Sequence, residues 1–145
     1  MKKEYRNPRE LSRPGSYTHV VSVSGARKLV YVSGQVSYAA DGSIVGKGDI
    51  RAQSEQVLKN VSAALEAAGA GWGDVVKLNA YMVDMNAEAL TAYREARARF
   101  LKAGQFPAST LVGVTRLVQD ELLLEVEVVA AIGSARPAKK AKKKR

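Results

Sequence analysis

Apolar and polar residues alternate along some stretches of the chain and recur three or four positions apart along others. Alternating or short continuous apolar runs are typical of strands, and the wider spacing is typical of amphipathic helices. The runs predict strands at residues 17–24, 29–33, 43–45, 75–83, 108–114 and 122–132. The first two flank a turn at 25–28 and are interpreted as a hairpin.

A first helix is predicted after the third strand. Apolar residues recur at helical spacing over residues 50–68, with one polar interruption at Ser54. Asp49 precedes them as the N-cap, because its carboxylate can accept the free amide hydrogens of the first turn. Gly69 follows and ends the helix, as glycine commonly does at this position.

A second helix is predicted between the strands at 75–83 and 108–114. Asn86 is its expected N-cap, and Pro107 prevents it from continuing. Its apolar stripe includes Arg97, whose aliphatic stem is expected to lie along the edge of the core. The resulting order, β-β-β-α-β-α-β-β, predicts an α+β domain in which two helices cover one face of a single mixed sheet.

The last predicted strand has two different faces. One face is apolar and is expected to meet the helices: it carries Leu122, Leu124, Val126, Val128, Ala130 and Ile132. The other carries two carboxylates among apolar residues: Leu123, Glu125, Glu127, Val129 and Ala131. A solvent-facing sheet is more uniformly polar, so this face is interpreted as a half-buried subunit interface with a polar pocket. An exposed face with scattered apolar residues is the alternative.

Composition narrows the classes of function. A chain of 145 residues fits one domain with its own core. It has no cysteine and one histidine, His19, which argues against disulfides, thiol nucleophiles, multi-histidine metal sites and a Ser-His-Asp triad. No apolar run reaches the roughly 18 residues of a membrane span, and the first ten residues lack the apolar stretch of a signal peptide. A soluble, cytoplasmic protein is therefore expected.

The net charge of +9 is concentrated at the two ends of the chain. Residues 1–13 contain five basic and two acidic side chains, and residues 136–145 contain seven basic and no acidic ones, so residues 14–135 carry −1. We divide the chain accordingly into a basic arm (1–13), a folded domain (14–135) and a basic tail (136–145) that is expected to be disordered. The tail either binds an anionic partner such as RNA or serves only for solubility.

Short motifs are spread across residues 14–132. They lie at residues 16–19 (SYTH), 30–35 (VYVSGQ), 48–53 (GDIRAQ), 58–60 (LKN), 65–69 (LEAAG), 74–77 (DVVK), 106–108 (FPA) and 125–127 (EVE). In order and spacing, the set resembles the reactive intermediate deaminase family, also called Rid, YjgF or endoribonuclease L-PSP. The resemblance implies a chorismate-mutase-like α+β fold and a homotrimer with ligand clefts between neighbouring subunits. It also implies that no metal or organic cofactor is needed.

The deaminase type of this family hydrolyses imines and enamines, such as 2-aminoacrylate, to a 2-keto acid and ammonia. Its strand after the Pro-Ala pair begins Pro-Ala-Arg-Ser, and the arginine binds the substrate carboxylate through its planar fork. In this chain Ser109 stands at that position. A neutral hydrogen bond contributes about 1 kcal/mol against about 1.5–3 kcal/mol for a charged one. The substrate is therefore expected to differ from the usual small 2-imino acid.

The resemblance also assigns the other site residues. Glu125 matches the glutamate that positions or activates the attacking water, and a half-buried carboxylate suits general acid-base work. Tyr17, Ser33, Gly34 and Thr110 are expected to line the same cleft, and Gly34 is expected to approach the ligand through its backbone. The structural alternatives are an interface carboxylate for Glu125, edge packing for Tyr17 and a turn for Gly34.

Several interpretations stay open at this stage. Glu127 and His19 are interpreted as structural residues. Arg116 and Lys77 are the cations considered as replacements for the family's arginine, although nothing in the sequence places either in the cleft. The alternative functions are a non-catalytic trimer that binds a small metabolite, and RNA or anion binding through the basic tail. The near-neutral charge of the folded domain argues against a basic nucleic-acid groove.

Overall fold

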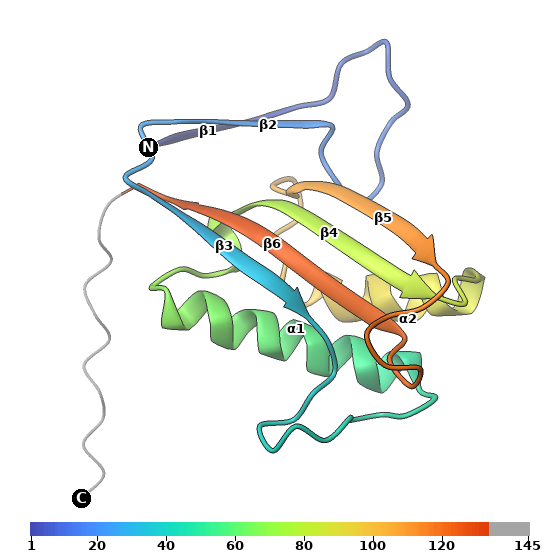
Figure 1. Ribbon diagram of the computed structural model, residues 1–145. Helices are drawn as coiled ribbons and strands as arrows, with labels where there is room; N and C mark the ends of the chain where they lie inside the picture. Colours follow the sequence, from blue (N-terminus) through green and yellow to red (C-terminus); the bar gives the residue numbers. More distant parts are fainter. Residues whose placement is uncertain (134–145) are drawn as a thin grey trace, which may run out of the picture.

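Residues 1–133 are described in a computed structural model, and a β-sheet and two α-helices form its two main layers (Figure 1). In chain order the elements are β1 (Lys2–Arg6), β2 (Val20–Ser24), β3 (Lys28–Gln35), α1 (Ile50–Ala67), the 3-10 helix η1 (Trp72–Asp74), β4 (Val75–Val83), α2 (Ala87–Ala98), β5 (Ala108–Val114) and β6 (Leu124–Ile132). The prediction of an α+β fold is confirmed. The basic tail predicted at 136–145 lies outside the described residues.

The main sheet has four strands in the order β3-β6-β4-β5. β6 pairs antiparallel with both β3 and β4, whereas β4 and β5 run parallel. Parallel neighbours require a crossover connection, and α2 provides it between β4 and β5. The sheet is therefore mixed, as predicted, and both helices lie against one of its faces (Figure 1). We call the opposite face the outer face of the sheet.

The hairpin predicted over residues 17–33 is wrong. β2 pairs antiparallel with β1, with Lys2 opposite Ser24, and these two strands form a separate two-stranded sheet. β3 instead pairs with β6, where the buried Val30 and Val32 of β3 join the core. The single sheet of the prediction is thus a four-stranded sheet plus a two-stranded ribbon. The strand predicted at 43–45 is reduced to one bridge, between Tyr38 and Ile44.

The predicted helix ends agree closely with the structure. The Asp49 carboxylate accepts hydrogen bonds from two first-turn amides of α1, at 2.9 and 3.1 Å. Asn86 caps α2 in the same way, at 2.9 Å. Gly69 follows α1 with a φ of +75°, the left-handed conformation that glycine adopts without strain. α2 ends at Ala98, three residues before the end of its predicted stripe. Neither helix, within residues 1–133, has the length and apolar character needed to cross a bilayer.

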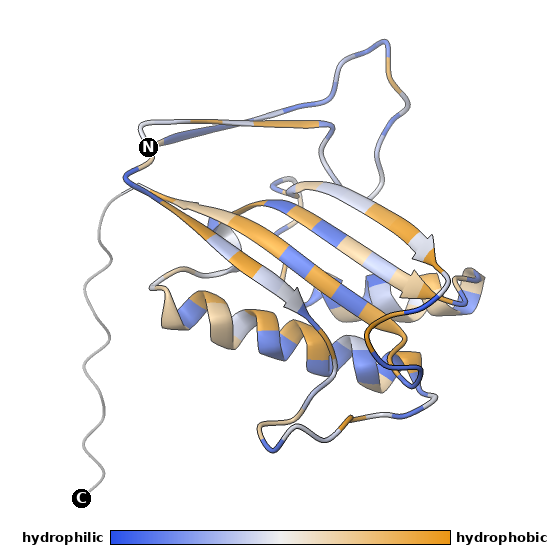
Figure 2. Cartoon of the chain, in the orientation of Figure 1, coloured by the Kyte–Doolittle hydropathy of each residue, from blue (hydrophilic) through white to orange (hydrophobic). Residues whose placement is uncertain are grey.

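The core lies between the sheet and the helices. All six apolar residues predicted to face inward from the last strand are buried, with exposures of 0–8%. All of them except Leu122 belong to one core cluster with the buried stripe of α1: Val57, Val61 and Leu65. Figure 2 shows the matching alternation of hydrophobic and hydrophilic residues along β4 and β6. This two-residue period places Glu125 and Glu127 on the outer face.

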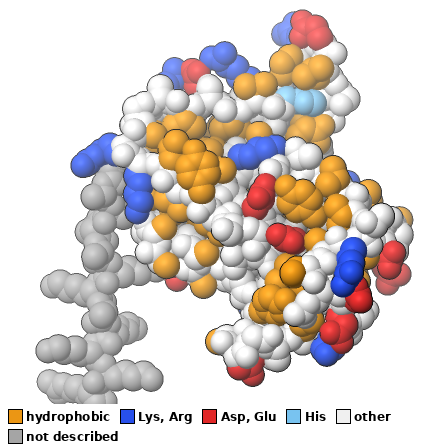
Figure 3. Space-filling model, viewed as in Figure 1, with side chains coloured by type: hydrophobic (Ala, Val, Ile, Leu, Met, Phe, Trp, Pro, Cys, Tyr) orange, Lys and Arg blue, Asp and Glu red, His pale blue; other side chains and the backbone are white. Residues whose placement is uncertain are grey.

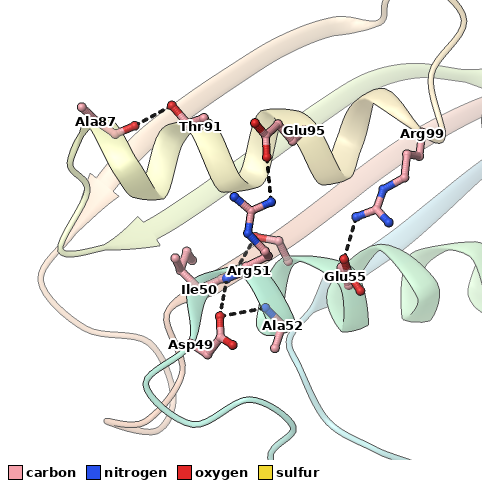
Figure 4. A network of polar contacts seen from close by, with 10 residues as sticks. Asp49, Ile50, Arg51, Ala52, Glu55, Ala87, Thr91, Glu95 and Arg99 are labelled. Atoms are coloured by element: carbon pink, nitrogen blue, oxygen red, sulfur yellow. Dashed lines mark hydrogen bonds and ion pairs between the residues drawn. The ribbon is translucent and has the colours of Figure 1, made fainter.

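Two ion pairs join the exposed sides of α1 and the end of α2 (Figure 4). Arg51 on α1 contacts Glu95 on α2, and Arg99 at the end of α2 contacts Glu55 on α1, each at 2.7 Å. All four side chains are more than a third exposed. Exposed pairs contribute little to stability and are screened by salt. They fix the relative position of the helices only weakly.

Glu55→Gln is expected to lower the free energy of unfolding slightly, and only at a pH above the folded-state pKa of Glu55. The hydrogen bond from Arg99, and then its positive charge, hold the pKa of Glu55 below the ordinary value of 4.5. A lowered carboxyl pKa stabilises the folded state above pH 4.5, and this contribution disappears as the pH falls through the folded-state pKa. Urea denaturation of wild type and variant at pH 7 and pH 3 measures the effect. A difference that is equally large at pH 3, or unchanged in 1 M salt, contradicts the ion-pair explanation.

Candidate functional site

The closest contact between predicted site residues joins β3 and β6. Gly34 lies on β3, where the pairing with β6 is irregular between Val32 and Gln35. A β-carbon built on Gly34 would overlap the Oε1 atom of Glu125 and would lie 2.7 Å from its Cδ atom. The Glu125 carboxyl group therefore lies directly on the backbone of Gly34. Only glycine leaves room for this approach.

Glu127 is held by a network on the same face. Asn79 and Tyr81 of β4 donate hydrogen bonds to its Oε1 atom, at 2.7 and 3.0 Å. The bond to Glu127 is the main cause that raises the pKa of the Tyr81 hydroxyl above 10, because it favours the protonated phenol. Glu127 is thus fixed by neighbouring side chains. No hydrogen bond to Glu125 is found within residues 1–133, which leaves its carboxylate available to a ligand.

A cavity of about 250 Å³ opens on the outer face of the sheet. Its lining is Tyr31, Val32, Ser33, Lys77, Asn79, Glu127, Val128 and Val129. Lys77 donates a hydrogen bond to the Thr110 hydroxyl at 2.8 Å, which brings this predicted site residue beside the cavity lining. Figure 3 shows acidic and basic side chains lying between hydrophobic ones on this face. Tyr31, which lines this cavity, is 74% exposed, so a large apolar side chain lies uncovered at the cavity in the single chain.

Ser109 and Tyr17 lie elsewhere, at the β5 edge of the sheet. The segment that carries Tyr17 runs beside the start of β5, because Thr18 forms a bridge with Ala108. The Thr18 amide and hydroxyl donate to the carbonyls of Pro107 and Phe106, at 3.1 and 2.7 Å. β6 and β4 separate β3 from β5. Within one chain, Tyr17 and Ser109 are therefore not brought together with Gly34 and Glu125.

The side chain of Ser109 points toward α2. Its partner is Arg97, whose Nη1 atom lies 3.5 Å from the Ser109 Oγ atom. The Nη2 atom of Arg97 donates to both the carbonyl and the hydroxyl of Ser16, each at 2.9 Å. Arg97 is only 6% exposed, and its Cζ atom lies 5.2 Å from the centroid of the Tyr93 ring. The guanidinium of Arg97 thus lies next to the side chain of Ser109.

The contacts of the Arg97 guanidinium were not predicted. The stem of Arg97 was expected at the edge of the core, which agrees with its burial, but no function was expected of the guanidinium. The available signal was an arginine at a position of the helical stripe otherwise taken by apolar residues. The two cations that were considered lie elsewhere. Arg116 forms an exposed pair with Asp120, and Lys77 lies on the outer face of the sheet.

His19 lies beside Tyr17 and helps to hold the segment before β2. The two rings meet edge to face with centroids 5.2 Å apart. The Nε2 atom of His19 lies 2.7 Å from the Ser12 carbonyl oxygen, and the His19 amide donates to the Asn7 side chain. These contacts are structural ones. Across residues 1–133, no three acidic or histidine side chains gather in a group able to hold a metal ion.

Comparison with known proteins connects these features to a family. A sequence profile described as Endoribonuclease L-PSP matches residues 9–132. A RutC family protein of Pyrococcus horikoshii is 35% identical over 116 residues, which cover 80% of this chain and 86% of that protein. The chain belongs to the Rid family. This confirms the resemblance seen in the sequence motifs, which lie within the matched residues.

Two other members of the Rid family are informative. The crystal structure of the Yersinia pestis protein YyfB, described as of unknown function, matches with a TM-score of 0.83 and 32% identity over 91% of this chain and all of that one. A 2-iminobutanoate/2-iminopropanoate deaminase of Salmonella typhimurium is 37% identical over 103 residues, 70% of this chain and 78% of that protein. The Rid relatives thus include a protein named as a deaminase and another described as of unknown function.

Proposed function

We propose that this chain is a cofactor-independent hydrolase of imines or enamines, with its sites at the clefts of a homotrimer. The observation that carries the proposal is the contact between Glu125 and Gly34. It places a carboxylate without a protein hydrogen-bond partner, within residues 1–133, against a half-buried backbone segment of β3. Membership of the Rid family, which includes a named deaminase of 2-imino acids, supports this chemistry.

In the proposed reaction Glu125 acts as a general base and then as a general acid. It accepts a proton from a water molecule while the water oxygen adds to the carbon of the C=N bond, and it then passes this proton to the imine nitrogen. In the tetrahedral intermediate, the carbon carries both the hydroxyl and the amine. Glu125 then takes the proton of this hydroxyl and passes it to the amine nitrogen, so that the C–N bond breaks, ammonia leaves and the oxygen forms the new C=O bond. One water is consumed and no electrons are transferred.

The trimer explains how residues that are separated in one chain act together. Gly34 and Glu125 lie at the β3–β6 side, whereas Tyr17 and Ser109 lie at the β5 edge. A cleft between subunits joins the first pair from one chain to the second pair from its neighbour. The exposed apolar residues of the strands, Leu29, Tyr31 and Val112, support such an interface, because large exposed apolar side chains mark association surfaces.

Glu125→Gln is expected to lower the rate of imine hydrolysis by about 10²–10⁴-fold, because the amide cannot accept the proton from water. The imine is 2-iminobutanoate, generated from 2-aminobutanoate by an amino-acid oxidase, and its decay is followed by trapping with semicarbazide. Glu66→Gln is the matched control, since Glu66 is an exposed carboxylate on α1. A Glu125→Gln variant as active as wild type contradicts the proposed role. A wild type without activity on any imine contradicts the proposed function.

A further inference from the structure

Arg97 is a buried cation without an anionic partner among the described residues 1–133. Its side chain is 6% exposed, and no carboxylate lies within ion-pairing distance of it among residues 1–133. Arginine keeps its positive charge at all relevant pH values. A buried charge is costly unless it is paired and hydrogen-bonded. Arg97 therefore carries a positive charge at a buried position, and no described side chain supplies the opposite charge.

The hydrogen bonds of Arg97 leave part of its guanidinium free. Guanidinium has five N–H donors. Nη2 makes two good bonds to Ser16, but the bond from Nη1 to Ser109 is 3.5 Å long, at the upper limit for a hydrogen bond. The Nε atom makes no hydrogen bond within the part of the chain that the structure describes. An oxygen anion could bind to the Nη1 hydrogens, whereas Nε points to the other edge of the guanidinium and forms a two-donor fork with Nη2 only if a bond to Ser16 is given up.

The neighbours of Arg97 are suited to an incoming ligand. Ser16 and Ser109 are both partly exposed, so the guanidinium lies beneath a part-open surface. Both serines carry neutral hydroxyls, which neither compete for the positive charge nor repel an anion. The buried Tyr93 hydroxyl beside Arg97 lacks a hydrogen-bond partner of good geometry among the described residues. Burial raises the pKa of Tyr93, and the charge of Arg97 opposes that shift.

We propose that Arg97 binds the carboxylate of the substrate, and that the guanidinium expected at position 109 is supplied here from α2. The small side chain of Ser109 leaves the space into which Arg97 extends. The substrate is then an imine or enamine that carries a carboxylate, which reverses the expectation based on Ser109 alone. The nature of this ligand rests on the proposed function, whereas the anion site itself is testable with a molecule that does not react.

The test is calorimetric titration of the full chain with 2-oxobutanoate, a carboxylate that carries the carbonyl of the expected product. Arg97→Met is expected to weaken binding by about ten- to a hundredfold, the range for losing a charged hydrogen bond. Arg99→Met is the matched control, two residues further on, because its exposed guanidinium pairs with Glu55. Butanone, the same carbonyl without the carboxylate, should not discriminate between wild type and Arg97→Met.

A double variant separates anion binding from a purely structural role. Arg97→Met/Ser109→Arg returns a guanidinium to the same place from β5 and is expected to recover most of the affinity, which a merely structural Arg97 would not allow. Arg97→Lys covers the case in which Arg97→Met does not fold, since it keeps the charge but loses the fork; it should bind about tenfold more weakly. Wild-type affinity in Arg97→Met or Arg97→Lys, or a double variant no better than Arg97→Met, overturns the assignment.

The outcomes also distinguish this inference from the proposed function. If the wild type binds 2-oxobutanoate through Arg97 but hydrolyses no imine, the anion site stands and the hydrolase proposal fails. If Arg97→Met hydrolyses 2-iminobutanoate with an unchanged KM, the hydrolase proposal stands and the anion site is overturned. Absence of any 2-oxobutanoate binding by the wild type overturns the anion site.

Discussion

Gly34→Ala is expected to abolish imine hydrolysis while leaving the fold in place. The added methyl group would overlap the Glu125 carboxyl group and lie 3.0 Å from its Cγ atom, so the Glu125 side chain must rotate away. A displacement of about 1 Å at a catalytic group can cost 10²-fold in rate. The φ of Gly34 is not positive, so alanine brings no backbone strain of its own. The measured quantities are kcat for 2-iminobutanoate and the midpoint of urea denaturation.

Gly73→Ala is the matched control for this change. Among residues 1–133, no neighbouring atom lies within 4 Å of a β-carbon built on Gly73, whose φ is also not positive. It should keep wild-type activity. If Gly34→Ala retains full activity while folding normally, the Glu125 carboxyl does not need its position against β3, and the site proposed here is misplaced. The denaturation midpoint distinguishes a loss of activity caused by displacement of Glu125 from a loss caused by unfolding.

Gln53→Leu is expected to destabilise the protein by about 2–4 kcal/mol. Gln53 of α1 is fully buried, and its amide joins the helix to the segment before β6. It donates to the Glu121 carbonyl at 2.7 Å and accepts from the Leu123 amide at 2.8 Å. Leucine has a similar size but leaves both part-buried backbone groups without these partners. Urea denaturation followed by circular dichroism measures the difference in the free energy of unfolding.

The third bond of Gln53, to the carbonyl of Gly46, adds less to this effect. That carbonyl also accepts from the Asp49 amide, so it keeps a partner in the variant. Gln56→Leu, one turn further along α1, is the control: its bond to the Tyr38 carbonyl is 3.4 Å long, and Asn60 also donates to that carbonyl at 2.8 Å. Its other bond, at 2.9 Å, goes to the Asn60 side chain and not to the backbone. A loss of less than about 1 kcal/mol is expected there. Equal losses in the two variants would contradict the bridging role of Gln53.

The elements predicted correctly are those in which the hydrophobic pattern and the residues at the ends of the element indicate the same structure. The strands at Val75–Val83 and Ala108–Val114 match their predictions to the residue. Asp49 and Asn86 cap the two helices as predicted, because their side chains satisfy local backbone amides without help from the rest of the fold. Local chemistry decides such features, so one sequence is sufficient to find them.

Pairing between strands could not be predicted in the same way. β1 is rich in charged residues, with the sequence KKEYR, and shows no apolar alternation. It forms because β2 offers backbone partners, and Glu4 pairs with its neighbours Lys2 and Arg6 on the exposed side of the strand. The hairpin prediction failed for the same reason: hydrophobic alternation shows that a segment is a strand but not which strand it pairs with.

The candidate site was predicted in part. The motifs identified the family and singled out Gly34 and Glu125, which the structure brings into contact. They gave no indication that the positive charge near Ser109 comes from a different element. Arg97 is twelve residues away in the sequence and on a helix, so only the packing of α2 against β5 reveals the proximity.

The central position of β6 determines the order in which the sheet can be completed. Within the four-stranded sheet, β3 pairs with β6 alone. β6 lies about a hundred residues later in the chain. During synthesis, the ribbon of β1 and β2 and the β4–α2–β5 unit can form early, but β3 and the apolar side of α1 must wait. Long-range pairing of this kind makes folding slow and exposes apolar surface meanwhile. A nascent chain stalled before Leu124 would therefore be a substrate for chaperones rather than a partly working protein.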